Sequence, residues 1–96
     1  MLEYNLTQLN NPELTANEAL LYCQFFRYND HTDWRLPSEK ELTFIIKMNP
    51  QINPIILERC WDAEYCSLVM ADDGSRFKRR KRRLLPVRGT LNEYNY

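Results

Sequence analysis

Residues 33–42 read Asp-Trp-Arg-Leu-Pro-Ser-Glu-Lys-Glu-Leu, and this stretch joins an extended segment to the start of a helix. Trp34 and Leu36 are expected as core residues on an extended segment, and Pro37 keeps the residue before it out of the helical region of backbone space. Ser38 and Glu41 have the spacing of a capping box, in which each side chain accepts a backbone N–H at the start of a helix. The stretch therefore predicts a helix that begins after Ser38.

The remaining elements follow from periodicity and from turn residues. Apolar residues at helical spacing predict a helix over residues 16–28, which Thr15 and Glu18 would begin as a second capping box. The helix after Ser38 is expected to stop at Asn49-Pro50. The other expectations are an edge strand within 1–10, mostly irregular structure over 49–59, strands over 60–64, 65–71, 75–79 and 84–88, a hairpin turn over 72–75 and a polar tail over 90–96.

The composition indicates a globular chain. Apolar residues make up 44% and aromatic residues 12% of 96 residues, a length that fits one domain. No apolar run has the length of a membrane span, and the first residues have neither the basic nor the apolar region of a secretion signal. We therefore expect a soluble, cytoplasmic protein with a single domain over residues 1–96 and no contact with a membrane.

The chain has three cysteines, Cys23, Cys60 and Cys66. An odd number cannot all pair within one chain, and their spacing matches no common zinc-binding pattern. Reduced, buried thiols are the favoured interpretation, and a Cys60–Cys66 disulfide is the alternative.

The net charge is zero, but the charges are distributed unevenly along the chain. Residues 1–75 carry twelve acidic and five basic side chains, a net of −7, whereas residues 76–96 carry eight basic and one acidic, a net of +7. Seven of the thirteen basic residues form the basic segment, residues 76–83, which contains Arg76, Lys78, Arg79, Arg80, Lys81, Arg82 and Arg83.

Three interpretations of the basic segment are open. It can bind nucleic acid, because several cations in series neutralise phosphates and release counterions. It can contact an acidic protein surface, including the acidic half of a second copy, which would give a homo-oligomer. As a merely solvated loop it would be unusual, because the six consecutive bases from Lys78 to Arg83 repel one another. Only Phe77 interleaves with the bases, which argues against a platform that stacks single-stranded bases.

Other candidate sites have simpler structural explanations. Acidic residues offer metal ligands at two places, Asp30 and Asp33 with His31 in one loop, and Asp62, Glu64, Asp72 and Asp73 further on. The loop offers no second shell, and Asp72 and Asp73 suit a turn. Trp61, like Trp34, is expected in the core rather than stacked on a sugar, and Arg35 is expected to pair with a neighbouring carboxylate. The sequence contains no recognisable catalytic motif, so we expect no enzymatic activity, no cofactor and no metal.

Several segments resemble a known family in the same order. Residues 33–42 resemble the signature WRLP-[ST]-x-x-E-L of a bacterial and phage C-type-lectin-like family, the one that forms the C-terminal domain of the collagen-like adhesin Lcl. They resemble, more distantly, the RLPTEAEWE segment of formylglycine-generating proteins. Further resemblances to the family lie at residues 19–23, 60–64, 70–77 and 86–89, so the similarity covers roughly residues 15–89.

The resemblance implies an α+β fold, a compact C-type-lectin-like domain. In this fold two helices flank an antiparallel sheet whose first and last strands are adjacent. Many family members have a cysteine where this chain has Pro86, so Cys23 would lack the disulfide partner which that position supplies. The loss fits a reducing compartment.

The leading functional hypothesis is a small, non-enzymatic intracellular binding protein encoded by a phage or mobile element. It would contact an acidic macromolecule, a host protein or nucleic acid in the host cytoplasm, through the basic segment, and would inhibit or redirect a protein partner. The alternative is a structural or adhesive lectin-like module of a tail fibre or surface protein that binds a glycan or receptor. A third hypothesis is head-to-tail assembly of the acidic body with the basic segment.

Overall fold

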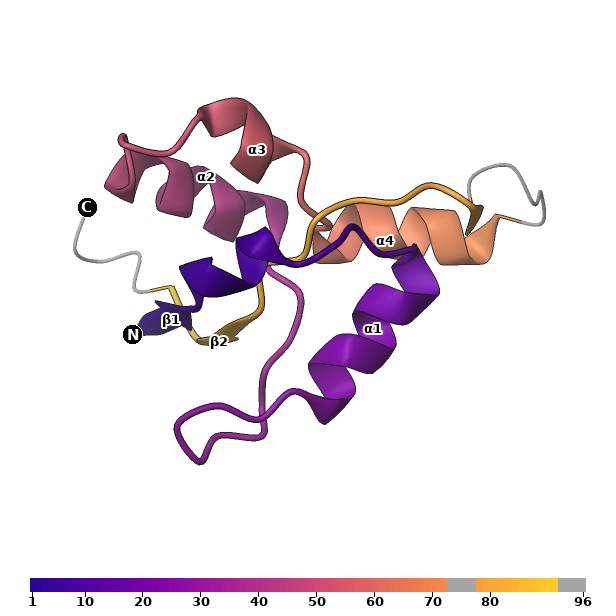
Figure 1. Cartoon of the computed structure of the whole chain (residues 1–96), viewed down its shortest axis with the longest axis horizontal. Coiled ribbons are helices and arrows are strands. Elements are labelled where there is room, and N and C mark those ends of the chain that lie inside the picture. The colour runs from indigo at the N-terminus through magenta and orange to yellow at the C-terminus, as the bar shows by residue number, and fades with distance from the viewer. Residues whose placement is uncertain (73–77, 92–96) are drawn as a thin grey trace.

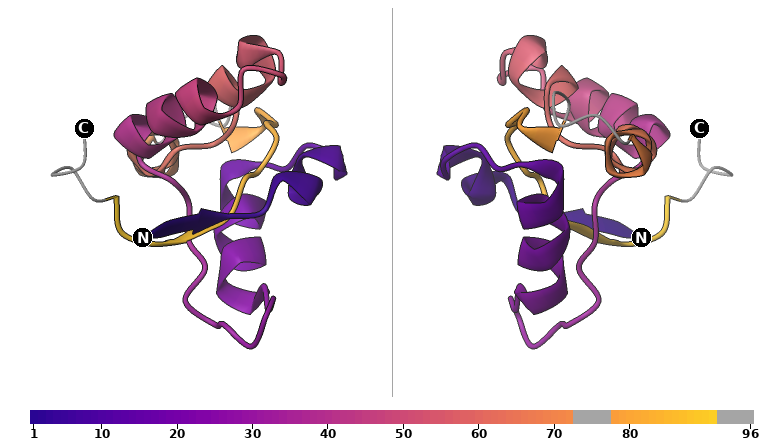
Figure 2. Two further views of the ribbon diagram at one scale, coloured as in Figure 1. Left: turned by 90° about the vertical axis from the view of Figure 1, so that its left-hand side faces the viewer. Right: turned by 90° about the vertical axis from the view of Figure 1, so that its right-hand side faces the viewer.

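The computed structural model describes residues 1–72 and 78–91 of the chain. These residues form an α+β fold with four α-helices and a two-stranded antiparallel sheet (Figure 1). The order is β1 (Leu2–Tyr4), the 3-10 helix η1 (Leu6–Asn10), α1 (Ala16–Phe25), α2 (Glu39–Met48), α3 (Pro54–Glu58), α4 (Ala63–Ala71) and β2 (Val87–Gly89). The two side views show α1 pointing away from α2 and α3 (Figure 2).

The first and last strands lie side by side, as the resemblance implies. β1 pairs antiparallel with β2, with Leu2 opposite Gly89. Gly89 has φ +81°, and a Cβ atom there would collide with the main-chain carbonyl of Met1, so this position favours glycine. The backbone of Arg35 exchanges hydrogen bonds of 2.8 and 2.9 Å with Val87, which ties the extended segment before α2 to β2.

The two predicted capping boxes are confirmed. Thr15 accepts the Glu18 N–H while Glu18 accepts the Thr15 N–H at 2.8 Å, and Ser38 and Glu41 do the same at the start of α2. α2 begins and ends where the sequence predicts. α1 begins as predicted but ends at Phe25 rather than at residue 28, because the chain then leaves the helical conformation and turns between Tyr28 and His31.

Arg35 pairs with a carboxylate, as predicted, and that carboxylate belongs to Glu41. Two parallel hydrogen bonds of 2.8 Å join the guanidinium to the two carboxylate oxygens, and Glu41 also accepts the Ser38 N–H. The same guanidinium donates to the carbonyl of Gly89 at 2.8 Å. Because Arg35 binds it so closely, the pKa of Glu41 lies below its ordinary value of 4.5. The pair joins α2 to the end of β2.

The prediction of strands over 60–64 and 65–71 is wrong, because residues 63–71 form α4. Asp62 begins this helix by accepting the Tyr65 N–H at 2.7 Å. Cys66 and Val69 then lie on one face of the helix and are both buried. The hydrogen-bonding capacity of the segment is therefore satisfied within the helix rather than by neighbouring strands.

The other predictions for the second half are met only in part. Residues 49–59 are mostly irregular, as predicted, but they include the short helix α3, which Asn53 caps and in which Pro54 occupies the first turn, where a missing N–H costs nothing. The predicted last strand over 84–88 is shorter and shifted, and forms β2. Of the predicted hairpin, residues 73–77 lie outside the described residues, and Lys78 and Arg79 are not in a strand. Most of the predicted polar tail, residues 92–96, also lies outside the described residues.

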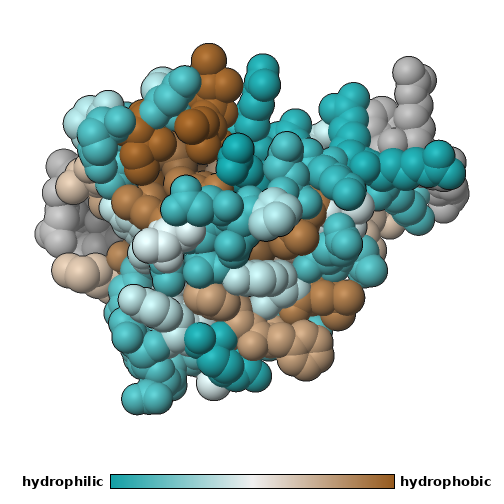
Figure 3. All heavy atoms as spheres, in the orientation of Figure 1, coloured by the Kyte–Doolittle hydropathy of each residue, from teal (hydrophilic) through white to brown (hydrophobic). Residues whose placement is uncertain are grey.

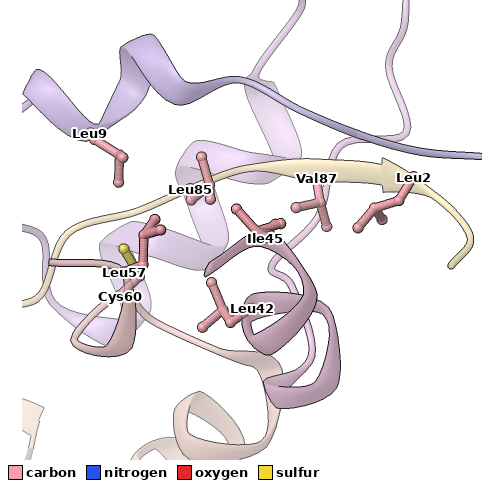
Figure 4. Packing of buried hydrophobic residues seen from close by; sticks show 8 residues of the cluster. All are labelled: Leu2, Leu9, Leu42, Ile45, Leu57, Cys60, Leu85 and Val87. Atoms are coloured by element: carbon pink, nitrogen blue, oxygen red, sulfur yellow. The ribbon is translucent and has the colours of Figure 1, made fainter. Parts of the chain in front are cut away.

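The buried side chains form two clusters. The first packs α2 and α3 against β1 and β2 and contains Leu2, Leu9, Leu42, Ile45, Leu57, Cys60, Leu85 and Val87 (Figure 4). The second lies around α1 and α4 and contains Ala16, Ala19, Cys23, Leu36, Trp61, Cys66, Val69 and Leu84. Neighbours in sequence, such as Leu84 and Leu85, belong to different clusters, so the segment that follows the basic segment connects the two. Trp34 and Trp61 are buried, as predicted.

Candidate functional site

The basic segment lies at one end of the molecule. Its described residues, 78–83, begin beyond α4 and run back along that helix toward β2 (Figure 1). This end is opposite the N-terminus and the β1–β2 sheet along the longest axis, which measures 41 Å (Figure 1). Arg76 and Phe77 lie outside the described residues.

Main-chain hydrogen bonds hold the last part of the basic segment in place. The N–H and C=O of Arg82 pair with those of Leu14 at 2.9 and 2.8 Å, and the carbonyl of Arg83 accepts the Trp61 N–H at 3.0 Å. The Arg83 guanidinium also donates to the carbonyl of Leu9 at 2.7 Å. Arg83 is therefore half-buried and acts as an anchor between η1 and the segment.

The Arg82 side chain lies against aromatic rings. Its guanidinium carbon is 4.2 Å from the centre of the Tyr65 ring, and the Tyr65 ring stacks on Trp61 at 5.4 Å. A cation over a ring face is attracted by the electrons of the ring, by about 0.5–1 kcal/mol at a partly exposed site. Trp61 is fixed in turn because its indole N–H donates to the carbonyl of Leu14 at 2.7 Å. Arg82 therefore packs on the body of the protein.

The other four described bases, Lys78, Arg79, Arg80 and Lys81, are exposed. Arg80 donates to the Tyr65 hydroxyl at 3.3 Å. Within residues 1–72 and 78–91, no carboxylate forms an ion pair with Lys78, Arg79 or Lys81. Long hydrophilic side chains project at this end of the molecule (Figure 3). Because neighbouring like charges repel, an anionic partner that neutralised them would be favoured.

An exposed leucine lies beside these cations. Leu68 on α4 is 71% exposed, the largest exposure of a large apolar side chain in the described residues after Met1. It lines a small pocket of about 310 Å³ together with Tyr65, Val69 and Asp72. Sequence reasoning missed this residue, because Leu68 was assigned to a strand. The Asp62 cap was the signal that places Leu68 on a helix, opposite the buried Cys66.

Three of the acidic residues considered as metal ligands, Asp33, Asp62 and Glu64, accept hydrogen bonds from other parts of the protein. Asp33 accepts hydrogen bonds of 2.7 and 3.3 Å from Arg88, which keeps the pKa of Asp33 below its usual value. Asp62 caps α4, and Glu64 accepts the Glu39 N–H at 3.2 Å. In the described part of the chain no group of three or more His, Cys, Asp or Glu residues is placed to hold a metal ion. Asp73 lies outside that part.

A larger cavity of about 500 Å³ lies between α1, α4 and the extended segment before α2. Its described lining includes Leu20, Trp34, Met70 and the two thiols of Cys23 and Cys66, but no carboxylate or imidazole that would serve as a general acid or base. Burial raises the pKa of Cys23 to about 12, so this thiol is protonated at neutral pH and is a weak nucleophile. All three cysteines are buried and free, in agreement with the favoured interpretation.

The thiols are therefore expected to react slowly in the folded protein. Burial raises the pKa of both Cys23 and Cys60 to about 12, whereas the pKa of an exposed thiol is about 8.5. With an aromatic disulfide reagent at mildly alkaline pH, labelling should be slow without denaturant and should accelerate with urea in parallel with unfolding. Complete labelling of all three thiols within the mixing time, without denaturant, would contradict the buried placement.

Comparisons with protein-family models, with curated proteins and with solved structures give no match for this chain. No helix among the described residues combines the length and the apolar character needed to cross a membrane. The surface at the end of α4 is therefore interpreted from its own chemistry.

Proposed function

We propose that this chain is a non-enzymatic binding protein that contacts an acidic macromolecule through the exposed cations of residues 78–81. One observation carries this proposal: four adjacent exposed bases lie at the end of the molecule, and the two bases that follow are anchored. Arg82 and Arg83 hold the backbone of the segment through Leu14, Trp61 and Leu9. The backbone that carries the exposed cations is therefore anchored at the end of the segment, which reduces the entropy lost on binding.

The likeness to phage and bacterial C-type-lectin-like domains supports a binding role. The pairing of β1 with β2 agrees with that fold, whereas α4 occupies the place of its expected middle strands. Three buried free thiols favour action in a reducing compartment such as a cytoplasm. A protein partner would be inhibited or redirected because the bound chain covers part of its surface.

A charge-removal variant tests the proposal. In Lys78→Gln/Arg79→Gln/Lys81→Gln, three exposed cations are removed, while Arg80, Arg82 and Arg83 keep their contacts with the body. The matched control Arg27→Gln/Lys47→Gln/Arg59→Gln removes the same charge from other exposed positions. Binding of a fluorescent polyglutamate peptide and of a short DNA duplex is measured by anisotropy at low and at physiological salt.

The expected result is binding of at least one probe, weakened about tenfold or more in the 78/79/81 variant and much less in the control. Binding should also weaken as salt rises, since exposed charges are screened. Equal binding by the two variants would show that only net charge matters, and it would refute the role of this segment. Absence of binding to both probes at low salt would also refute the proposal.

A further inference from the structure

The exposed cations and the exposed leucine belong to one continuous surface. Tyr65 connects them: its hydroxyl accepts from Arg80 at 3.3 Å, and its ring lines the pocket beside Leu68. We call this surface the α4 tip and define it by six residues, Tyr65, Leu68, Lys78, Arg79, Arg80 and Lys81. It lies where the chain returns along α4, far from the N-terminus and the β1–β2 sheet (Figure 1).

Leu68 contributes little to the stability of the isolated protein. With 71% of its surface exposed, it lies outside both buried clusters, whereas Val69, the next residue, is 3% exposed. An exposed leucine next to a pocket of about 310 Å³ offers apolar surface that an apolar side chain of a partner can cover. The surrounding cations would then form the polar rim of that contact.

We propose that the partner of the α4 tip is an acidic protein segment that carries an apolar side chain. Its carboxylates would pair with Lys78, Arg79 and Lys81, and its apolar side chain would pack on Leu68 in the pocket. This inference rests on the proposed function and narrows its partner to one class. The argument is complementarity, because an apolar centre flanked by cations matches an apolar residue flanked by acids.

Two features favour protein over nucleic acid as the partner. The Tyr65 ring is half-buried, stacks on Trp61 and has the Arg82 guanidinium 4.2 Å from its centre, so it does not project from the surface as a platform for stacking bases. Leu68 would bury little apolar surface against the charged phosphate backbone of a nucleic acid.

The test uses two peptides and a single-residue variant. One peptide is glutamate-rich with leucines, and the second has the same length and charge with serine in place of leucine. Leu68→Gln removes the apolar contact while keeping a good helix former. Leu21→Gln is the matched control, since Leu21 is an exposed leucine, 46% accessible, on α1.

The wild type is expected to bind the leucine peptide about tenfold more tightly than the serine peptide. Leu68→Gln should abolish that difference, and Leu21→Gln should retain it. Equal affinity for the two peptides, a difference that survives Leu68→Gln, or binding of a DNA duplex without binding of the leucine peptide would overturn the inference. A different result would refute the proposed function itself: equal affinity of the wild type and the 78/79/81 variant for the serine peptide and for DNA.

Discussion

Replacement of Trp61 by alanine is expected to destabilise the protein by about 3–5 kcal/mol, the largest effect of any substitution considered. The Trp61 side chain is fully buried, stacks on Tyr65 and donates its indole N–H to the carbonyl of Leu14 at 2.7 Å. Its removal would leave a cavity, and the Leu14 carbonyl would keep only the hydrogen bond from the Arg82 main-chain N–H. It would also remove the aromatic ring that lies under the Arg82 side chain together with Tyr65.

Urea denaturation measures this effect, and Trp61→Phe separates its two parts. Phenylalanine keeps an aromatic ring in the second cluster but cannot donate to Leu14, so we expect a smaller loss of about 1–2 kcal/mol. An alanine variant whose free energy of unfolding lies within about 0.5 kcal/mol of the wild type would contradict the packing described for Trp61.

The second large effect is expected at Glu41. The Glu41→Gln variant should lose about 2 kcal/mol of stability at neutral pH, because the bidentate pair with Arg35 and the charged part of the capping box are both lost. The Arg35 side chain is 43% accessible, so this loss of stability is smaller than the loss expected when one partner of a fully buried ion pair is removed.

The pH dependence of stability gives an independent measurement of the same pair. The pKa of Glu41 in the folded protein lies below its ordinary value of 4.5, so its contribution is present above about pH 4.5 and is lost as the pH falls through the folded pKa. The difference in urea midpoint between wild type and Glu41→Gln should therefore shrink as the pH is lowered below 4.5. Glu39→Gln, an exposed position on the same helix, is the control. A difference that stays constant from neutral to acidic pH would contradict the account of the pair.

Local signals in the sequence were sufficient for the first half of the fold. The two capping boxes, at Thr15 and at Ser38, supply acceptors for the first backbone N–H groups of each helix. The starts of α1 and α2 were therefore predictable without tertiary information. The pairing of Arg35 with a nearby carboxylate was also predictable, because Glu41 lies in the first turn of the helix that follows the Arg35 segment.

In the second half, strands predicted from side-chain bulk are wrong where a capping residue begins a helix instead. Val69, Leu68 and Tyr65 favour strands in isolation, but Asp62 supplies a helix cap, and burial of Cys66 with Val69 suits a helix face. Within residues 49–59, which the sequence predicts to be mostly irregular, asparagine as a cap followed by proline in the first turn is a helix start at Asn53-Pro54.

The division of the basic segment could not have been predicted from its sequence. Seven bases in one block look equivalent, and only tertiary contacts distinguish them. Arg83 is anchored by Leu9 and Arg82 by Leu14 and Tyr65, partners that are distant in sequence from the two arginines. Once these contacts are known, the exposed cations of residues 78–81 and Leu68 are the residues left available to a partner.

The most direct test of the central claim is residue-level mapping of the bound surface. An isotope-labelled chain is titrated with the glutamate-rich leucine peptide, and backbone amide shifts are followed by NMR. We predict that the largest shifts lie at residues 65, 68 and 78–82, with little change in α2, α3 and the middle of α1. Shifts centred on another face, or no shifts at peptide concentrations that saturate the anisotropy signal, would contradict the assignment of the α4 tip as the partner-binding surface.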